Sequence, residues 1–176
     1  SETGMPFYLG TDEQGRDILS GILYGLRVSL TVSVIATFFA MTIGVVVGIY
    51  AAWIGGSIES ILMRMVDLQL SFPSILVALM LMAAFGRGLD KVVVALVVVQ
   101  WAYYARTVRG TALSETQKDY IAAARCLGFS GARILLRHLL PNCLPPLLVI
   151  STIQIANTIV LESSLSFLGV GVPVTS

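Results

Sequence analysis

The stretch TQKDYIAAARCLGFSGARILLRHLLPN, residues 116–142, is a polar segment between long apolar runs, and it decides how the chain folds. Two short helices fit its pattern, 118–127 before Gly128 and 131–140 after it. The first helix carries Ala122 and its two alanine neighbours, and small side chains let two backbones approach closely. The pattern therefore favours a helix that docks into a cleft of another protein, although a plain polar connector between membrane helices fits it equally well. The basic residues of this segment and its histidine are Lys118, Arg125, Arg133, Arg137 and His138.

The second helix of the polar segment is predicted to be amphipathic. Arg133 and Arg137 share one face at i, i+4, while leucine and isoleucine side chains supply apolar cover. Pro141 follows. We expect it to end this helix and to begin the next one, because the first turn of a helix does not need the proline's missing N–H group.

The composition indicates an integral membrane protein. Of the 176 residues, 56% are hydrophobic and 12% are charged, whereas a soluble domain carries about 25% charged residues. A soluble core of this size cannot bury so much apolar sequence. The formal net charge of +1 provides no basic field, so nucleic acid is not an expected partner. The chain opens inside a polar stretch without a starting methionine, and we expect it to be a fragment of something longer.

The cysteines and the histidine do not predict an active site or a metal site. Cys126 and Cys143 lie near the polar segment, which we place in the cytoplasm, so a disulfide is not expected. Cys126 is expected to be a small packing residue. His138 stands alone, and no cysteine–histidine group has the spacing of metal ligands.

The N-terminal stretch contains a false nucleotide motif. Gly10 and Gly15 have the spacing of a phosphate-binding loop, but Arg16 and Asp17 follow in place of Lys and Ser or Thr, so nucleotide binding is rejected. Asp12 and Asp17 are instead candidate helix caps, and Asp17 leads directly into apolar residues.

Four runs can cross a bilayer core of about 30 Å. Pro73 should kink or divide the second of them. The apolar part of the third, 92–105, is short, so a re-entrant segment is the alternative to a span. Gly44 and Gly48 form a G-x-x-x-G pair that favours close packing within the chain over dimerisation. The predicted spans are 28–54, 58–86, 89–109 and 141–162.

A few polar side chains fall within or beside the spans. Arg64 and Asp67 are three apart and are predicted to form a structural ion pair on one helix face. Gln154 and Asn157, also three apart, should face protein or a translocation path and not lipid. Trp53 is a candidate anchor at the membrane interface.

The distribution of basic residues predicts the orientation. The polar segment carries most of them, so the positive-inside rule places it in the cytoplasm. Counting back through two spans puts 87–91 outside and Gly55–Gly56 inside. The first 27 residues and the end near Glu162 then lie outside.

The polar segment resembles a known loop. Ala122 to Gly128, followed after a spacer by Leu140 and Pro141, is similar to the EAA loop of permease subunits in ABC importers, which reads roughly E-A-A-x-x-x-G, a spacer, then I-x-L-P. Ala122 stands where the loop often has Glu, so the role of that Glu is not carried over. The resemblance implies that 114–140 forms a cytoplasmic coupling helix on an ATPase. The residues that it assigns to this loop are Asp119, Tyr120, Ala122, Ala123, Ala124, Arg125, Gly128, Arg133, Leu140 and Pro141.

Three further segments resemble one subfamily, the second permease subunit of dipeptide, oligopeptide and nickel importers. They are GTDEQGRDILS at 10–20, MRMVDLQLSFP at 63–73 and ESSLSFLGVG at 162–171. Gly21 departs from the subfamily, which often has a basic residue there. The resemblance covers nearly the whole chain and implies an all-α, type I-like permease domain over 28–171, with 172–176 as the end of the fragment. The family typically has six spans, so it also implies that one is missing at each end.

The resemblance also implies partners and a location. It predicts a multi-pass protein of a bacterial inner membrane that works with a second permease, two cytoplasmic ATPase subunits and an extracytoplasmic binding protein. No cofactor is expected on this chain and no enzymatic activity, since the partners would use ATP. A passive channel or secondary carrier is the alternative, and a membrane scaffold without transport is a third. The substrate stays open among peptides, nickel complexes and glutathione-like solutes.

Overall fold

The protein is described by a computed structural model that places residues 8–11 and 15–169, so the proposed cap at Asp12 and the tail 172–176 lie outside the described residues. Within these ranges the regular secondary structure is helical, with short connections between the helices and an isolated bridge between Thr11 and Asp17. The expected all-α class is confirmed. The helices are α1 (Ile18–Ile54), α2 (Gly56–Ser71), α3 (Ser74–Phe85), α4 (Leu89–Thr116), α5 (Asp119–Cys126), α6 (Gly131–Ile134) and α7 (Leu140–Phe167), with a π-helical turn at Leu135–Leu139 between α6 and α7.

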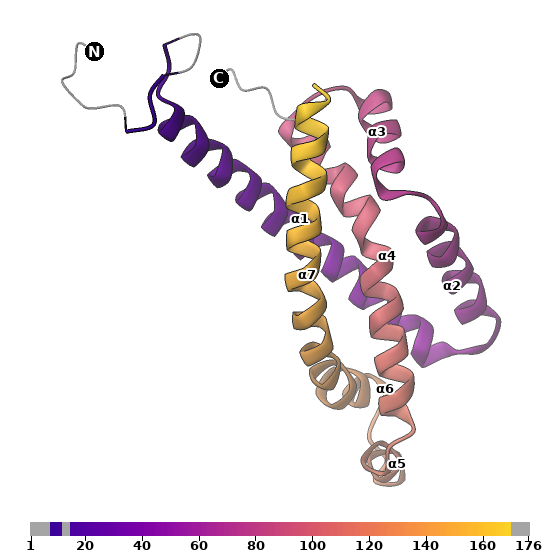
Figure 1. Ribbon diagram of the computed structural model, residues 1–176. Helices are drawn as coiled ribbons and strands as arrows, with labels where there is room; N and C mark the ends of the chain where they lie inside the picture. The colour runs from indigo at the N-terminus through magenta and orange to yellow at the C-terminus, as the bar shows by residue number, and fades with distance from the viewer. Residues whose placement is uncertain (1–7, 12–14, 170–176) are drawn as a thin grey trace.

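Helix α1 is longer than the sequence predicted. It has 37 residues and begins at Ile18, which gives it a length of about 55 Å. The predicted cap at Asp17 is confirmed, because its carboxylate accepts hydrogen bonds from the backbone N–H groups of Leu19 at 3.2 Å and Ser20 at 3.3 Å. The apolar run that starts at residue 28 is therefore only the later part of a helix that its cap starts ten residues earlier. Figure 1 shows α1 crossing the other helices obliquely.

Close packing of α1 on α4 forms the centre of the bundle. Gly44 and Gly48 are buried on α1, and a Cβ atom at Gly48 would lie 2.6 Å from the carbonyl oxygen of Ala105 on α4. A Cβ atom at Gly44 would lie 2.7 Å from the carbonyl oxygen of Trp101. The expected close packing within the chain is confirmed, because only hydrogen fits at these two positions.

The second predicted span is divided. Helix α2 ends at Ser71 and α3 begins at Ser74, and the two meet at an angle of 91° around Pro73. The expected break at Pro73 is confirmed, since proline disfavours helical geometry in the residue before it and lacks an N–H group. By length and composition, the described residues contain three helices that can cross a membrane, or four if α2 and α3 together make one broken span. Helix α4 is continuous over 28 residues.

The expected helix end at Pro141 is wrong, although the proline stands in the first turn of α7, as expected. The chain stays helical from Gly131 to Phe167, and the π-helical turn carries it past the proline. Leu140 donates its backbone N–H to the carbonyl oxygen of Leu135, five residues back, and the Asn142 Nδ2 group donates to the carbonyl oxygen of His138 at 2.6 Å. The wider turn accommodates the proline ring, which would otherwise clash with the preceding turn of a helix.

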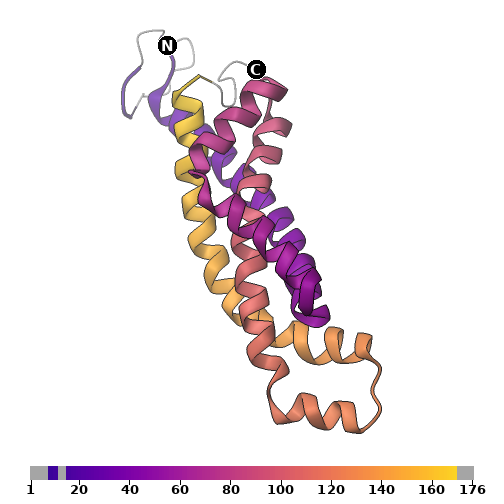
Figure 2. The same cartoon turned by 90° about the vertical axis from the view of Figure 1, so that its right-hand side faces the viewer.

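The helix ends and the connections between helices lie at two opposite ends of the molecule. Helices α5 and α6 lie at one end, and the beginning of α1, the connection from α3 to α4 and the end of α7 lie at the other (Figures 1 and 2). This arrangement agrees with a polar segment that lies on the opposite side from both outer parts of the chain.

Candidate functional site

The polar segment forms a helical hairpin that projects from the end of the bundle (Figure 2). Gly128 follows the end of α5 and has a φ of +73°, a backbone conformation that is unfavourable for residues with a Cβ atom. The Phe129 N–H group donates to the carbonyl oxygen of Ala124 at 3.2 Å, and the Gly128 N–H group donates to that of Arg125 at 3.0 Å. This pair of bonds is a Schellman motif, and it turns the chain back toward the membrane helices.

Helix α5 has a buried face and an exposed face. Ile121 and Ala124 are buried and form a small core with Ile134 of α6. Ala122 and Ala123 are exposed and present methyl groups to the outside of the molecule. Of the three alanines, two are thus available to a partner and the third holds the hairpin together. The exposed residues of this surface are Asp119, Tyr120, Ala122, Ala123, Arg125 and Cys126.

Trp53, at the end of α1, packs against the hairpin. A Cβ atom at Gly131 would lie 2.8 Å from the Trp53 Cζ2 atom, and the Arg125 guanidinium lies 5.7 Å from the centre of the Trp53 ring. The sequence predicted Trp53 as an interface anchor and did not predict this contact. Its partners are more than seventy residues away along the chain, so spacing could not identify them.

A polar network joins the hairpin to α4 and α7. The Glu115 carboxylate, on the last turn of α4, accepts from Lys118 Nζ and from the Tyr120 hydroxyl, each at 2.6 Å. Asn142 Nδ2 of α7 donates to the Tyr120 hydroxyl at 3.2 Å. Tyr120 is exposed in part only, and the partial burial of its ring raises its pKa to about 12, together with the hydrogen bond to Glu115 and that residue's charge. Sequence reasoning missed Glu115, and the i, i+3 spacing to Lys118 was the available signal.

The later members of the predicted loop have different surroundings. Arg133 is exposed, and its guanidinium lies 5.4 Å from the centre of the Phe129 ring. Leu140 is half-buried against the core between α1 and α4. Pro141 is exposed next to the π-helical turn. Leu140 and Pro141 therefore join the hairpin to α7, and the exposed alanine surface is on α5.

The predicted ion pair between Arg64 and Asp67 is wrong. Asp67 pairs instead with Arg106. Arg106 is on α4, and α4 lies beside α2. A second pair joins the same two helices, because Arg109 Nη2 lies 2.6 Å from the Glu59 carboxylate. The spacing within α2 would allow Arg64 to pair with Asp67. The packing of α4 against α2 instead places the Arg106 guanidinium beside Asp67. The two ion pairs brace α2 on α4.

Glu162 and the two cysteines complete the set of notable polar side chains. Glu162 of α7 is 3% exposed, and its carboxylate accepts from the hydroxyl groups of Ser29 at 2.6 Å and Ser166 at 3.2 Å. This contact ties the start of the membrane part of α1 to the end of α7. Both cysteines are free, and Cys126 is exposed, so its expected role as a packing residue is wrong. Cys143 is buried.

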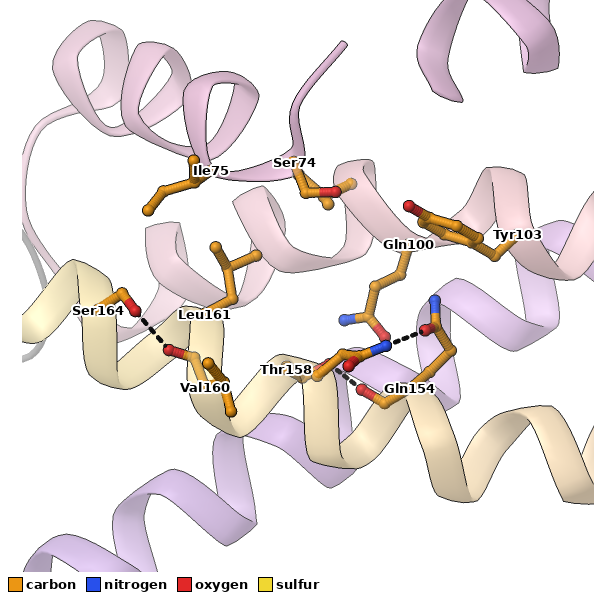
Figure 3. Close-up of a pocket in the computed structure, with 11 residues that line it drawn as sticks. Ser74, Ile75, Gln100, Tyr103, Gln154, Thr158, Val160, Leu161 and Ser164 are labelled. Atoms are coloured by element: carbon orange, nitrogen blue, oxygen red, sulfur yellow. Dashed lines mark hydrogen bonds between the residues drawn. The ribbon is translucent and has the colours of Figure 1, made fainter. Parts of the chain in front are cut away.

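Gln154 and Asn157 border a cavity of about 320 Å³ between α3, α4 and α7 (Figure 3). Asn157 Nδ2 donates to Gln154 Oε1 at 2.9 Å. Gln154 is buried and Asn157 is exposed. Among the described residues the full lining is Ser74, Ile75, Val99, Gln100, Tyr103, Gln154, Asn157, Thr158, Val160, Leu161 and Ser164. No group of three or more potential metal ligands occurs in the described part of the chain.

Comparison with known proteins identifies the family. Residues 44–176 match the model of the binding-protein-dependent transport system inner membrane component. The chain belongs to this family.

Curated relatives match along nearly the whole chain. A transport system permease protein of Brucella suis is 42% identical over 97% of this chain and 57% of its own length. A dipeptide transport system permease protein of Bacillus subtilis is 40% identical over 94% of this chain and 52% of its own. A nickel transport system permease protein of Escherichia coli is 35% identical over 94% of this chain and 60% of its own. The chain thus spans little more than half the length of these relatives.

Solved structures share the fold. The MetNI methionine ABC transporter, in inward-facing conformations, contains a chain that superposes with a TM-score of 0.78 at 23% identity, over 92% of this chain and 79% of that one. An amino acid ABC transporter superposes with a TM-score of 0.56 at 21% identity, over 88% of this chain and 77% of that one. The expected type I-like permease fold is confirmed.

Proposed function

We propose that this chain is the membrane-spanning core of a permease subunit in an ATP-binding cassette importer for peptides or related small solutes. The exposed Ala122–Ala123 surface of α5, at the end of the bundle, is the observation that carries the proposal. A helix that presents only methyl groups between Tyr120 and Arg125 can enter a narrow cleft of an ATPase. The names of the relatives from Bacillus subtilis and Escherichia coli support the peptide and nickel class of importer.

The proposed assembly contains a second permease subunit, two cytoplasmic ATPase subunits and an extracytoplasmic binding protein, all in or at a bacterial inner membrane. The hairpin lies on the cytoplasmic side, since it carries the basic residues Arg125, Arg133 and Arg137. The ATPase subunits bind and hydrolyse ATP, and this chain binds no cofactor of its own. The role of this chain is to change the arrangement of its helices when the ATPase subunits move.

The contacts of the hairpin suggest how movement reaches the membrane. Trp53 connects the hairpin to α1, and Glu115 connects Tyr120 to α4. The π-helical turn continues directly into α7. A displacement of α5 by the ATPase is therefore passed to three long helices at once, and these helices border the cavity or pack on its walls. Their movement opens the path alternately to the two sides.

Substitution of Ala123 by Trp tests the docking surface. The bulky ring should stop ATP-driven peptide uptake, because it does not fit where two helices meet closely, while insertion and stability of the protein stay unchanged. Uptake into vesicles that contain the full-length importer measures the effect. The matched control is Ala84→Trp, which places the same ring at an exposed position on α3, at the other end of the molecule. Undiminished uptake by the Ala123→Trp variant would rule out docking through α5.

A further inference from the structure

A second, apolar groove lies between the later part of α1 and the π-helical turn that leads into α7. Its volume is about 230 Å³. Val46 and Tyr50 line it on the α1 side, and Leu136 and Leu140 line it on the other. Apart from Tyr50, all of its described lining residues are valine, isoleucine or leucine. Val46 is 64% exposed and Leu136 is 62% exposed. An open groove with aliphatic walls fits a hydrocarbon chain and does not fit a polar solute.

One end of this groove lies close to the level of the lipid headgroups. Tyr50 is half exposed and stands four residues before the end of α1 at Ile54. Trp53, three residues further along, packs against the hairpin at Gly131. Tyrosine and tryptophan side chains are enriched where the hydrocarbon of a bilayer meets its headgroups. A lipid in the groove would therefore have its headgroup beside the hairpin and its acyl chain along α1.

Two arginines flank the groove on the hairpin side. Arg133 precedes the lining residue Leu136 by three positions, and Arg137 follows it directly, so both side chains start from the segment that forms one wall. Both arginines are exposed. No ion pair is recorded for either of them in the part of the chain that the structure describes. The hairpin side of the groove therefore carries two positive charges that the described chain does not neutralise.

The walls of the groove supply no negative charge. Neither α1 nor the stretch 120–161 contains an Asp or Glu residue. The next acidic residues along the chain are Glu59 on α2 and Asp119 on α5, and Glu59 is already paired with Arg109. An anion from outside the chain is the partner that fits this distribution of charge.

We propose that the groove binds an anionic phospholipid, with one acyl chain between α1 and the π-helical turn and the headgroup phosphate against Arg133 and Arg137. Guanidinium groups bind phosphate oxygens through paired, charge-assisted hydrogen bonds, and basic pockets between membrane helices bind lipid headgroups. A single amphiphile uses both parts of the site. Free phosphate would leave the groove empty, and a hydrocarbon alone would leave the arginines unpaired. The inference goes beyond the proposed function, because it needs neither an ATPase nor a transported solute.

Photocrosslinking with two lipids tests the site. The full-length protein, purified with its associated subunits, is placed in phosphatidylcholine nanodiscs. These contain a small fraction of phosphatidylglycerol with a diazirine in one acyl chain, or of phosphatidylcholine with the same chain. Mass spectrometry measures the label in 45–50 and 135–140. The phosphatidylglycerol probe should label these segments roughly twentyfold more, because two arginines attract it. At Leu148 and Val149, which are exposed on α7, the two probes should label equally.

Arginine variants test the role of charge. Arg137→Gln should lower the preference for the phosphatidylglycerol probe about fivefold, the contribution of one basic residue near an anionic headgroup. Arg137→Lys keeps the charge and should keep most of the preference. Arg64→Gln is the matched control, since Arg64 is exposed on α2 and also has no recorded ion pair among the described residues. The yield with the phosphatidylcholine probe reports whether each variant keeps the groove intact.

Three results would overturn the lipid site. The first is equal labelling of the groove by the two probes, and the second is a preference that survives Arg137→Gln or falls equally with Arg64→Gln. The third is a groove that neither probe labels, because another protein segment or subunit would then cover it. None of these results bears on ATP-driven uptake, so the importer and the lipid site can fail separately.

Discussion

Gly128 is the residue on which the shape of the hairpin depends. Its φ of +73° places it in the left-handed region, yet a Cβ atom there would meet nothing within 4 Å. Backbone strain is therefore the main cost that alanine would add, and that strain amounts to about 1 kcal/mol. The Schellman bonds that close α5 depend on this conformation.

Gly128→Ala should loosen α5 without disturbing the membrane helices. We expect amide hydrogen exchange in α5 to accelerate about fivefold, which corresponds to the loss of about 1 kcal/mol of local stability. Gly110→Ala is the control, because Gly110 has ordinary helical geometry and no atom within 4 Å of a Cβ position. Unchanged exchange in the Gly128→Ala variant would show that α5 does not need the left-handed turn.

At the scale of single residues, the sequence identified positions whose role is local. Ala122, Ala123 and Gly128 follow from spacing along a short helix, and Asp17 follows from its place before an apolar run. Trp53, Gln100 and the partner of Asp67 did not follow, because their environment comes from helices that are distant in the sequence. Local patterns carry no information about which side chain another helix will bring.

At the scale of elements, two prolines behave differently although the sequence predicts a break at each. Pro73 divides α2 from α3 at 91°, and the chain there uses the break to line a cavity. Pro141 follows a π-helical turn, and the helix continues. The predicted first span begins at residue 28, which is too late for the start of α1. Hydropathy marks the apolar core of a helix, whereas the cap at Asp17 marks its beginning.

Gly44→Ala tests the packing of α1 on α4. The added methyl group would collide with the Tyr104 side chain and the Trp101 carbonyl group, and overpacking of this kind costs about 1–3 kcal/mol. The free energy of unfolding in detergent should fall by that amount, measured by denaturant titration. Gly25→Ala on the same helix is the matched control, since its Cβ position is open. Equal stability of the two variants would contradict the close contact.

At the scale of the whole molecule, the features fall into a consistent order along its length. The exposed α5 surface lies at one end, the cavity lies between the long helices, and the contact of Glu162 with Ser29 lies toward the other end. The central contact of α1 with α4 and the ion pairs from α2 to α4 make these helices a unit that can transmit movement. The proposed function requires such a separation, because an ATPase would act at one end and the translocation path would lie between the long helices.

The most direct measurement is crosslinking from α5 in membranes that contain the ATPase subunits. The full-length chain carries Ala123→Cys, and Ser130→Cys in a second sample. Cys126 and Cys143 are replaced, because the exposed Cys126 thiol would react beside position 123. The proposed function predicts a crosslink from position 123 to an ATPase subunit, with a yield that changes when ATP is added. No crosslink, together with labelling of these cysteines from outside by an impermeant reagent, would invert the orientation and contradict the coupling role.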